Sequence, residues 1–226
     1  MLVRDWMKIN VISIEADASL DAAVRLLKEH NIGMLPVMRA GELVGIVTDR
    51  DIKRHSASEA TSLDIHELIY LISKIKVSDI MSRNPITVKP DYTVEETAEI
   101  LLKEKISGVP VINDQGKLVG IITKSDLFKV IISMNGLPKR GIKFAVKTLN
   151  RVGAVQEVID IFRKYGGRIM NVLVFLESGD DKYLNACIRM YGIDRNHFSA
   201  LKEELQEKAT PLYMVDYFEN RREIYL

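Results

Sequence analysis

The stretch Pro110–Asp126, which reads PVINDQGKLVGIITKSD, decides the fold because the chain contains it twice. Upstream, Pro36–Asp51 reads PVMRAGELVGIVTDRD, and VRDWM at residues 3–7 returns as VSDIM at residues 77–81. The copies are 74 residues apart (77 − 3), and Gln115 adds one residue at the turn, so the spacing is 75 from there on. Self-similarity over this length indicates a duplicated structural unit. The chain up to about residue 135 therefore consists of two repeats.

Composition and charge are those of an ordinary globular protein. The 226 residues are 47% hydrophobic and 28% charged, which allows a packed core and does not indicate disorder. The net charge of +1 gives no electrostatic reason to expect binding to nucleic acid or to an anionic membrane. Cys187 is the single cysteine, which excludes an internal disulfide and favours a reducing compartment. Because the N-terminus lacks an apolar signal core and no apolar run approaches the roughly 18 residues of a membrane span, we expect a cytoplasmic protein.

Each repeat carries the pattern of a β-α-β-β-α unit. In the first repeat, Ile9–Ile14 is a predicted strand, and the apolar residues of the next segment have the spacing of one buried helix face, with Ser19 as a candidate N-cap. Met34–Met38 and Leu43–Val47 are apolar runs joined by a short glycine-containing turn, which predicts a hairpin. A second helix is then expected to begin at Thr48.

The pattern changes after Asn135–Gly141, a cluster of glycine and proline that predicts a domain boundary. Beyond it, strands and helices are expected in the order β-α-β-β-α-β, which describes a ferredoxin-like domain. The predicted fold class is therefore α+β (mixed α/β). The predicted segments are residues 1–60 (first repeat), 61–76 (a helical connector), 77–135 (second repeat), 141–218 (C-terminal domain) and 219–226 (a polar tail).

One motif recurs at the end of each hairpin, as Gly45–Asp51 and Gly120–Asp126, with the pattern G-x-x-T-x-x-D. Threonine followed three residues later by an acid is a capping box, and a helix start needs no ligand to explain it. The same geometry also suits a ligand, because helix-start N–H groups and a threonine hydroxyl bind phosphate and a carboxylate accepts ribose hydroxyls. Arg50 adds a phosphate-compatible charge, whereas the second copy has Ser125 at that place, so the two sites are not expected to be equivalent.

With these residues in view, the two repeats resemble a tandem pair of CBS domains, a regulatory module whose repeats pack side by side and form clefts for adenosyl compounds. The resemblance rests on Asp5-x-Met7 and Asp79-x-Met81, on Pro36-Val37 and Pro110-Val111, and on the two G-x-x-T-x-x-D segments. It implies that Asp51 and Asp126 hold ribose and that Thr48 and Thr123 hold phosphate or ribose. It also implies that the backbone near Ile12 and Ile86, with the loops before Pro36 and Pro110, lines the base pockets. The implied regulatory ligand is AMP, ADP, ATP or S-adenosylmethionine, with no catalytic cofactor.

Residues 141–218 resemble an ACT domain, a small module that often binds amino acids at a paired interface. Beside the element order, the resemblance rests on NRVGAV at residues 150–155, where that family commonly has Asp-x-Pro-Gly-x-Leu. Asn150 replaces the acid and Val152 the proline, but Gly153 matches and is followed by Ala154, so Asn150, Gly153 and Ala154 are the candidate ligand residues. A purely dimerising role is the alternative, because exposed strands of such sheets readily pair.

The arrangement as a whole is similar to the AcuB family of acetoin-utilisation proteins, which suggests a role in acetoin or related carbon metabolism. The sequence shows no nucleophile motif, and His30, His55, His66 and His197 are scattered without metal-ligand spacing. We therefore expect a non-catalytic regulatory protein that binds an adenine nucleotide, forms a homodimer or higher homo-oligomer and acts on a protein partner. Neither nucleic acid nor a membrane is an expected partner. The alternative is an oligomerisation scaffold in which the Thr-x-x-Asp segments are helix caps alone.

Overall fold

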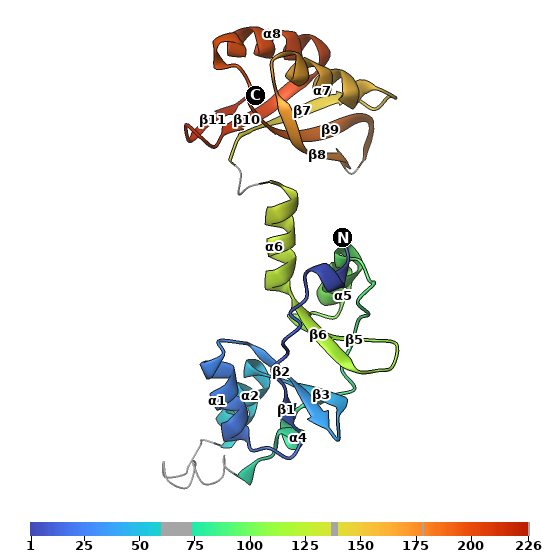
Figure 1. Cartoon of the computed structure of the whole chain (residues 1–226), viewed down its shortest axis with the longest axis vertical. Coiled ribbons are helices and arrows are strands. Elements are labelled where there is room, and N and C mark those ends of the chain that lie inside the picture. Colours follow the sequence, from blue (N-terminus) through green and yellow to red (C-terminus); the bar gives the residue numbers. More distant parts are fainter. Residues whose placement is uncertain (60–73, 137–139, 178, 226) are drawn as a thin grey trace. The chain divides into compact units, whose positions relative to one another are not determined.

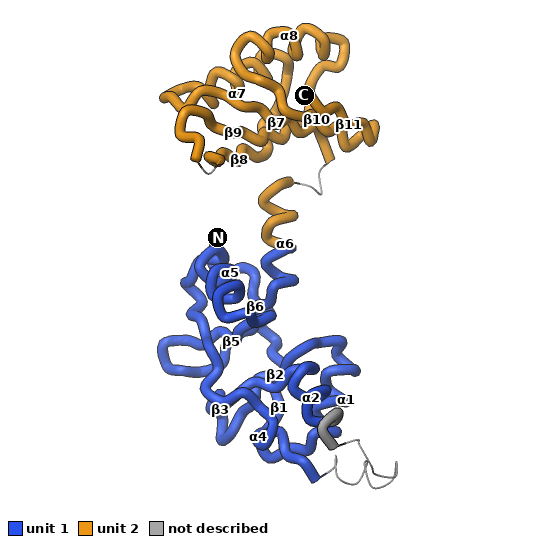
Figure 2. The backbone as a smooth tube through the Cα atoms, turned by 180° about the vertical axis from the view of Figure 1, so that it is seen from behind, with its two compact units in different colours: residues 1–128 blue, residues 129–226 orange. Residues whose placement is uncertain are grey.

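The structure, a computed structural model, describes residues 1–59, 74–136, 140–177 and 179–225. Its chain divides into two compact units, residues 1–128 and 129–226, shown in separate colours in Figure 2. The division falls within helix α6 (Lys124–Met134), a few residues before the predicted boundary. The predicted helical connector at 61–76 lies almost wholly outside the described residues.

The first unit holds the two repeats, and in each of them a helix begins where the second strand of a hairpin ends (Figure 1). Its elements before α6 are η1 (Val3–Asp5), β1 (Ile14–Glu15), α1 (Leu20–Glu29), β2 (Met34–Arg39), β3 (Glu42–Thr48), α2 (Asp49–Glu59), α4 (Val77–Ile80), β4 (Ser82–Arg83), α5 (Val94–Lys103), β5 (Gly108–Ile112) and β6 (Leu118–Thr123). The predicted N-cap of α1 is confirmed, because the Ser19 side chain accepts a hydrogen bond from the Ala22 N–H at 3.2 Å.

The two hairpins have different turns, which explains the extra residue of the second copy. Ala40 and Gly41 both have positive φ (50° and 82°), as a two-residue turn of the hairpin-favouring hand requires. In the second copy the Asn113 side chain accepts hydrogen bonds from the Gln115 and Lys117 N–H groups at 3.0 and 2.9 Å. Asparagine side chains commonly build longer turns in this way. The insertion therefore stays within the turn and leaves the strand pairing of the two copies alike.

Equivalent positions of the two copies are buried. Leu27 of α1 and Leu35 of β2 belong to one hydrophobic cluster in the first repeat. Leu101 and Val109, which stand 74 residues later, are fully buried in the second repeat. Because apolar burial is the main stabilising contribution to folding, each copy has its own core of the same design.

The first segment of each repeat crosses the hairpin of the other repeat. Strand β4, at the start of the second repeat, pairs with β3, where Ser82 lies opposite Ile46. In the same manner Lys8 pairs with Ile121 of β6, and each of these two residues donates its N–H to the other's carbonyl, at 2.9 and 3.0 Å. The repeats are thus joined twice by equivalent backbone pairings.

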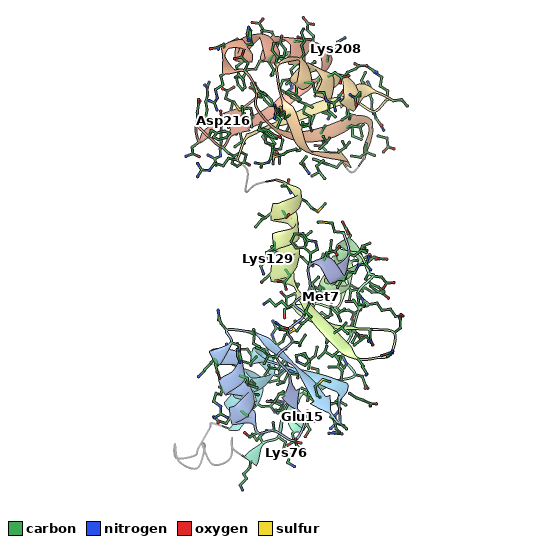
Figure 3. The ribbon with its side chains drawn as sticks, viewed as in Figure 1. Met7, Glu15, Lys76, Lys129, Lys208 and Asp216 are labelled. Carbon is green, nitrogen blue, oxygen red and sulfur yellow. The ribbon has the colours of Figure 1, made fainter. Side chains whose placement is uncertain are left out.

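Glycine allows both crossings. A Cβ at Gly45 would lie 2.6 Å from the Met81 sulfur and 2.9 Å from the Ser82 carbonyl oxygen. At Gly120 the corresponding contact is made by the sulfur of Met7, a residue labelled in Figure 3. Both glycines therefore serve close approach between the repeats.

The strand predicted at Ile9–Ile14 is wrong except for its last residue, because β1 consists of Ile14–Glu15. Lys8 already pairs with β6 of the other repeat, so the following residues run between two hairpins before the chain reaches β2. In the second copy the equivalent of β1 is an isolated parallel bridge between Val88 and Val111.

The second unit consists of one antiparallel sheet with two helices on one face. Beyond α6 its elements are β7 (Ile142–Leu149), α7 (Ala154–Lys164), β8 (Arg168–Glu177), β9 (Asp180–Tyr191), η3 (Arg195–His197), α8 (Phe198–Lys208), β10 (Thr210–Asp216) and β11 (Arg221–Ile224). The strand order is β11-β10-β7-β9-β8. Strand β11 pairs with β10 in the segment for which a polar tail was predicted.

Alternation along β9 separates the two faces of this sheet. Ile188 and Met190 pack with Phe162 of α7 and Leu201 of α8 in the core. Cys187 points to the opposite face, where its sulfur lies 3.6 Å from the Tyr213 hydroxyl. Burial raises the pKa of Tyr213 to about 12, and the Cys187 contact adds to that rise. The thiol is free and buried.

Candidate functional site

The two Thr-x-x-Asp segments form capping boxes. The Asp51 carboxylate accepts hydrogen bonds from the Thr48 hydroxyl at 2.6 Å and from the Thr48 N–H at 3.0 Å, and the Asp51 N–H donates to the Thr48 hydroxyl at 3.3 Å. Thr123 and Asp126 repeat this arrangement at 2.6, 3.1 and 3.4 Å. The helix-start interpretation of the motif is therefore confirmed in both copies.

A capping box alone does not indicate a ligand. Thr93 and Glu96 form the same arrangement at the start of α5, and the Thr93 hydrogen bonds hold the pKa of the Glu96 carboxyl below its usual value. What distinguishes Asp51 is its accessibility. Its side chain is partly exposed, whereas Asp126 is 2% exposed. Among the described residues, the second carboxylate oxygen of Asp51 accepts no hydrogen bond, so it remains available to a ligand.

A pocket of about 490 Å³ lies beside Thr48, and residues of both repeats line it. From the first repeat come Thr48, Arg50 and Asp51, which are predicted site residues, together with Met34, Ile46 and Arg54. From the second repeat come residues 82–86, which include the predicted Ile86, and residues 105–108, which form the loop before Pro110. Lys124 completes the lining. The pairing of β4 with β3 thus brings the start of the second repeat close to the Thr-x-x-Asp motif of the first repeat.

The remaining predicted residues lie elsewhere in the first unit. Pro36 and Pro110 are buried within β2 and β5, and the pocket is lined by Met34 and Gly108, two residues before each of them. Ile12, Thr123 and Asp126 are not part of this pocket's lining. In the chain they follow Lys8 and Ile121, whose pairing is the equivalent of the β3–β4 pairing in the other copy.

The pocket is strongly cationic. Among the described residues that line it, five are positively charged, Arg50, Arg54, Arg83, Lys105 and Lys124, and one is acidic, Asp51. Among the described residues, none of the five forms an ion pair with a carboxylate. Because like charges repel at short range, such a cluster favours an anionic ligand.

Sequence reasoning found Arg50 and missed the other four cations. Arg54 stands three residues after Asp51 and so lies on the same helix face, a spacing that points to it. Arg83, Lys105 and Lys124 are distant in the chain, and only the pairing of the repeats brings them to Thr48. A position-by-position comparison of the two copies, which shows four of the five cations in one copy alone, was the available signal.

The C-terminal candidates are arranged less favourably. The Asn150 amide donates to the Asp181 carbonyl at 2.8 Å, and Ala154 is buried. Gly153 has a positive φ of 85° and open space around its Cα, at the start of α7. These three residues flank one turn, where a side-chain amide is already bonded within the protein.

The described part of the chain offers neither a metal-ligand cluster nor a membrane-spanning helix. No group of three or more His, Cys, Asp or Glu side chains there is arranged to hold a metal ion. In the same residues, no helix has the length and apolar character needed to span a membrane.

Comparison with known proteins agrees with the duplication. The family model of the CBS domain matches residues 3–58 and 77–133. The chain belongs to the CBS-domain family. A CBS domain-containing protein of Dictyostelium discoideum is 33% identical over 135 residues, which are 59% of this chain and 93% of that protein.

Solved structures of CBS pairs are also similar. The CBS domain pair of protein MJ0100, in complex with 5′-methylthioadenosine and S-adenosylmethionine, is 33% identical with a TM-score of 0.51 and covers 59% of this chain and 97% of its own. CBSX2 in complex with AMP is 29% identical with a TM-score of 0.50 and covers 59% and 98%. These matches concern the two repeats. The ACT-type assignment of the C-terminal unit stays a prediction.

Proposed function

We propose that this protein is a non-catalytic regulatory protein that binds an adenosyl nucleotide in the pocket between its two CBS repeats. The observation that carries the proposal is the pocket itself, which joins Thr48 and Asp51 of one repeat to Ile86 and residues 105–108 of the other. The similar CBS pairs that were solved with AMP, or with 5′-methylthioadenosine and S-adenosylmethionine, support this ligand class.

The ligand groups are assigned by chemistry. The accessible oxygen of Asp51 accepts the ribose hydroxyls, as a carboxylate does in other nucleotide sites. The apolar lining of Met34, Ile46 and Ile106 covers the base, and Arg50 reaches the phosphate. The start of α2 contributes less, because its Asp49 N–H donates to the Gly33 carbonyl at 3.2 Å.

The regulatory step is a change in the packing of the two repeats. A ligand that contacts both repeats stabilises the arrangement in which those contacts form, which is the condition for a conformational response. We propose that the response reaches the C-terminal unit, as an ACT-type module, or a protein partner. We propose that this regulation acts in the cytoplasm, in acetoin or related carbon metabolism; the support for this is the resemblance of the sequence to acetoin-utilisation proteins.

The proposal is tested by thermal-shift measurements on the full chain with AMP, ADP, ATP and S-adenosylmethionine. A ligand at 100 times its dissociation constant adds about 2.7 kcal/mol to the folded state, so the melting temperature of the first unit should rise by several degrees. Guanosine nucleotides at the same concentration are the matched control for base recognition. If none of the four adenosyl compounds shifts the melting temperature, the proposal is wrong.

One observation favours a second role in self-association. Strand β8 is an edge of its sheet and ten residues long, and its consecutive side chains Leu173–Leu176 are 41–47% exposed. A long apolar edge strand is a template for pairing with another chain. We propose that it pairs with β8 of a second copy to form a homodimer.

Changing this edge should separate the dimer. Leu173 and Phe175 point to the same face of β8, so a Leu173→Glu plus Phe175→Glu variant places two charges on that face. Sedimentation analysis should then show monomer where the unmodified chain shows dimer. A matched double change at the exposed Gln156 and Asp160 of α7 should leave the dimer intact. A dimer that survives the β8 change would contradict this interface.

A further inference from the structure

We infer that the Thr48 pocket selects nucleotides with two or three phosphates and that the equivalent positions around Thr123 do not supply this preference. The inference rests on the proposed function and adds to it the chemistry that distinguishes ATP and ADP from AMP and S-adenosylmethionine. Its basis is the cation cluster of Arg50, Arg54, Arg83, Lys105 and Lys124.

The cluster carries more charge than a monophosphate needs. On the described lining residues, five cations against Asp51 leave four positive charges (5 − 1) around a pocket of about 490 Å³. A phosphate monoester brings about two negative charges, so AMP would leave the pocket cationic, whereas a triphosphate comes close to neutralising it. S-adenosylmethionine carries a sulfonium cation, which this cluster repels.

The two copies of the sequence differ at these five positions. At the places equivalent to Arg83, Lys105 and Lys124, the other copy has Ile9, Asn31 and Asp49. The places equivalent to Arg50 and Arg54 hold Ser125 and Lys129. One position in five therefore keeps its positive charge and another becomes acidic. Since the caps and the crossings are alike in both copies, the difference concerns charge and leaves the backbone unchanged.

Lys105 brings a positive charge to the pocket from a backbone conformation that lysine rarely adopts. It follows α5 with a φ of 55°, in the left-handed region that glycine and asparagine adopt most readily. The equivalent residue of the other copy is Asn31, with a φ of 48°. A cation after a helix C-terminus is favoured by the helix dipole, but the left-handed φ suits asparagine better than lysine, and the lysine also brings a positive charge to the pocket lining.

The residues of the other copy supply the test variants. Arg50→Ser, Lys105→Asn and Lys124→Asp each install the side chain that the chain already tolerates at the equivalent place, and an acid at the start of a helix is favourable. The triple variant should therefore fold. Arg25→Ser, on the exposed face of α1 and outside the pocket, is the control for loss of surface charge.

The inference is tested by isothermal titration of the full chain with AMP, ADP, ATP, S-adenosylmethionine and inorganic tripolyphosphate, which measures the affinity for each. We expect ATP to bind at least about tenfold more tightly than AMP, because each charge-assisted hydrogen bond is worth about a factor of ten or more. The triple variant should lower ATP affinity to about that of AMP, and raised salt should weaken ATP more than AMP.

Four results would overturn the inference, and they are distinguishable. Equal affinity for AMP and ATP, or an unchanged ratio in the triple variant, contradicts polyphosphate selection while the proposed function stands. Tripolyphosphate that binds as tightly as ATP contradicts the nucleotide assignment. Failure of every adenosyl compound to bind removes the proposed function itself.

Discussion

An Asp51→Ala variant should lose adenosyl-nucleotide binding by about 10- to 100-fold for each ribose hydrogen bond removed, because hydrogen bonds to a charged group are worth about 1.5–3 kcal/mol. The variant also loses the α2 capping box, which costs about 0.5–2 kcal/mol of folding stability. Isothermal titration measures the first effect and thermal denaturation the second. Asp51→Asn keeps an acceptor for the cap without the charge, so it should retain most of the stability and still bind weakly.

The chain itself contains the matched control. Asp126→Ala removes an identical cap from α6, yet Asp126 is 2% exposed and lies outside the pocket that Asp51 lines. We expect this variant to lose as much stability as Asp51→Ala or more, while affinity at the Thr48 pocket changes less than about threefold. Equal loss of affinity in both variants would show that Asp51 affects binding only through its cap and does not contact the ligand.

A Gly45→Ala variant should destabilise the first unit by about 1–3 kcal/mol, the usual cost of overpacking. The new methyl group meets the Ser82 carbonyl oxygen at 2.9 Å, and backbone has no rotamer by which to move aside. The crossing segment must then shift, and with it Ser82 and Arg83, which line the pocket. Nucleotide affinity should therefore fall together with the melting temperature.

Gly33→Ala is the control for this change. A Cβ at Gly33 meets nothing within 4 Å, and its φ lies outside the left-handed region, so the substitution should alter stability by less than about 0.5 kcal/mol. A Gly45→Ala protein with unchanged melting temperature and affinity would contradict the close crossing of the repeats. Circular dichroism melting and titration with ATP make the comparison.

The duplicated parts of the fold were predictable because each local signal occurred twice. The hairpins, the caps and the burial of Leu27 and Leu101 follow from spacing, turn residues and helix-start chemistry, which act over a few residues. The prediction of a strand at Ile9–Ile14 was wrong, because after Lys8 has paired with β6 the chain runs from one hairpin to the other and forms a strand only from Ile14. Strand β11 was missed because its exposed RREI segment lacks the alternation of a half-buried strand.

Only part of the candidate site was predicted from the sequence. Thr48, Arg50, Asp51 and Ile86 do line one pocket, and the motif that carries three of them is local. Of the remaining cations, Arg83 lies on β4, Lys105 follows α5 and Lys124 begins α6. They reach Thr48 only through the packing of the two repeats, which includes the β3–β4 pairing of residues nearly forty positions apart. Local periodicity carries no information on such a pairing. The unequal charge of the two copies was visible in the sequence, but only the structure shows that the cations of one copy line the same pocket.

The most direct measurement is a crystal structure of the full chain grown with ATP. The account predicts a nucleotide in the Thr48 pocket, with the ribose hydroxyls on the Asp51 carboxylate, the base against Ile106 and the phosphates among Arg50, Lys105 and Lys124. A nucleotide bound elsewhere on the chain, or bound in this pocket with its phosphates turned away from the cations, would contradict it.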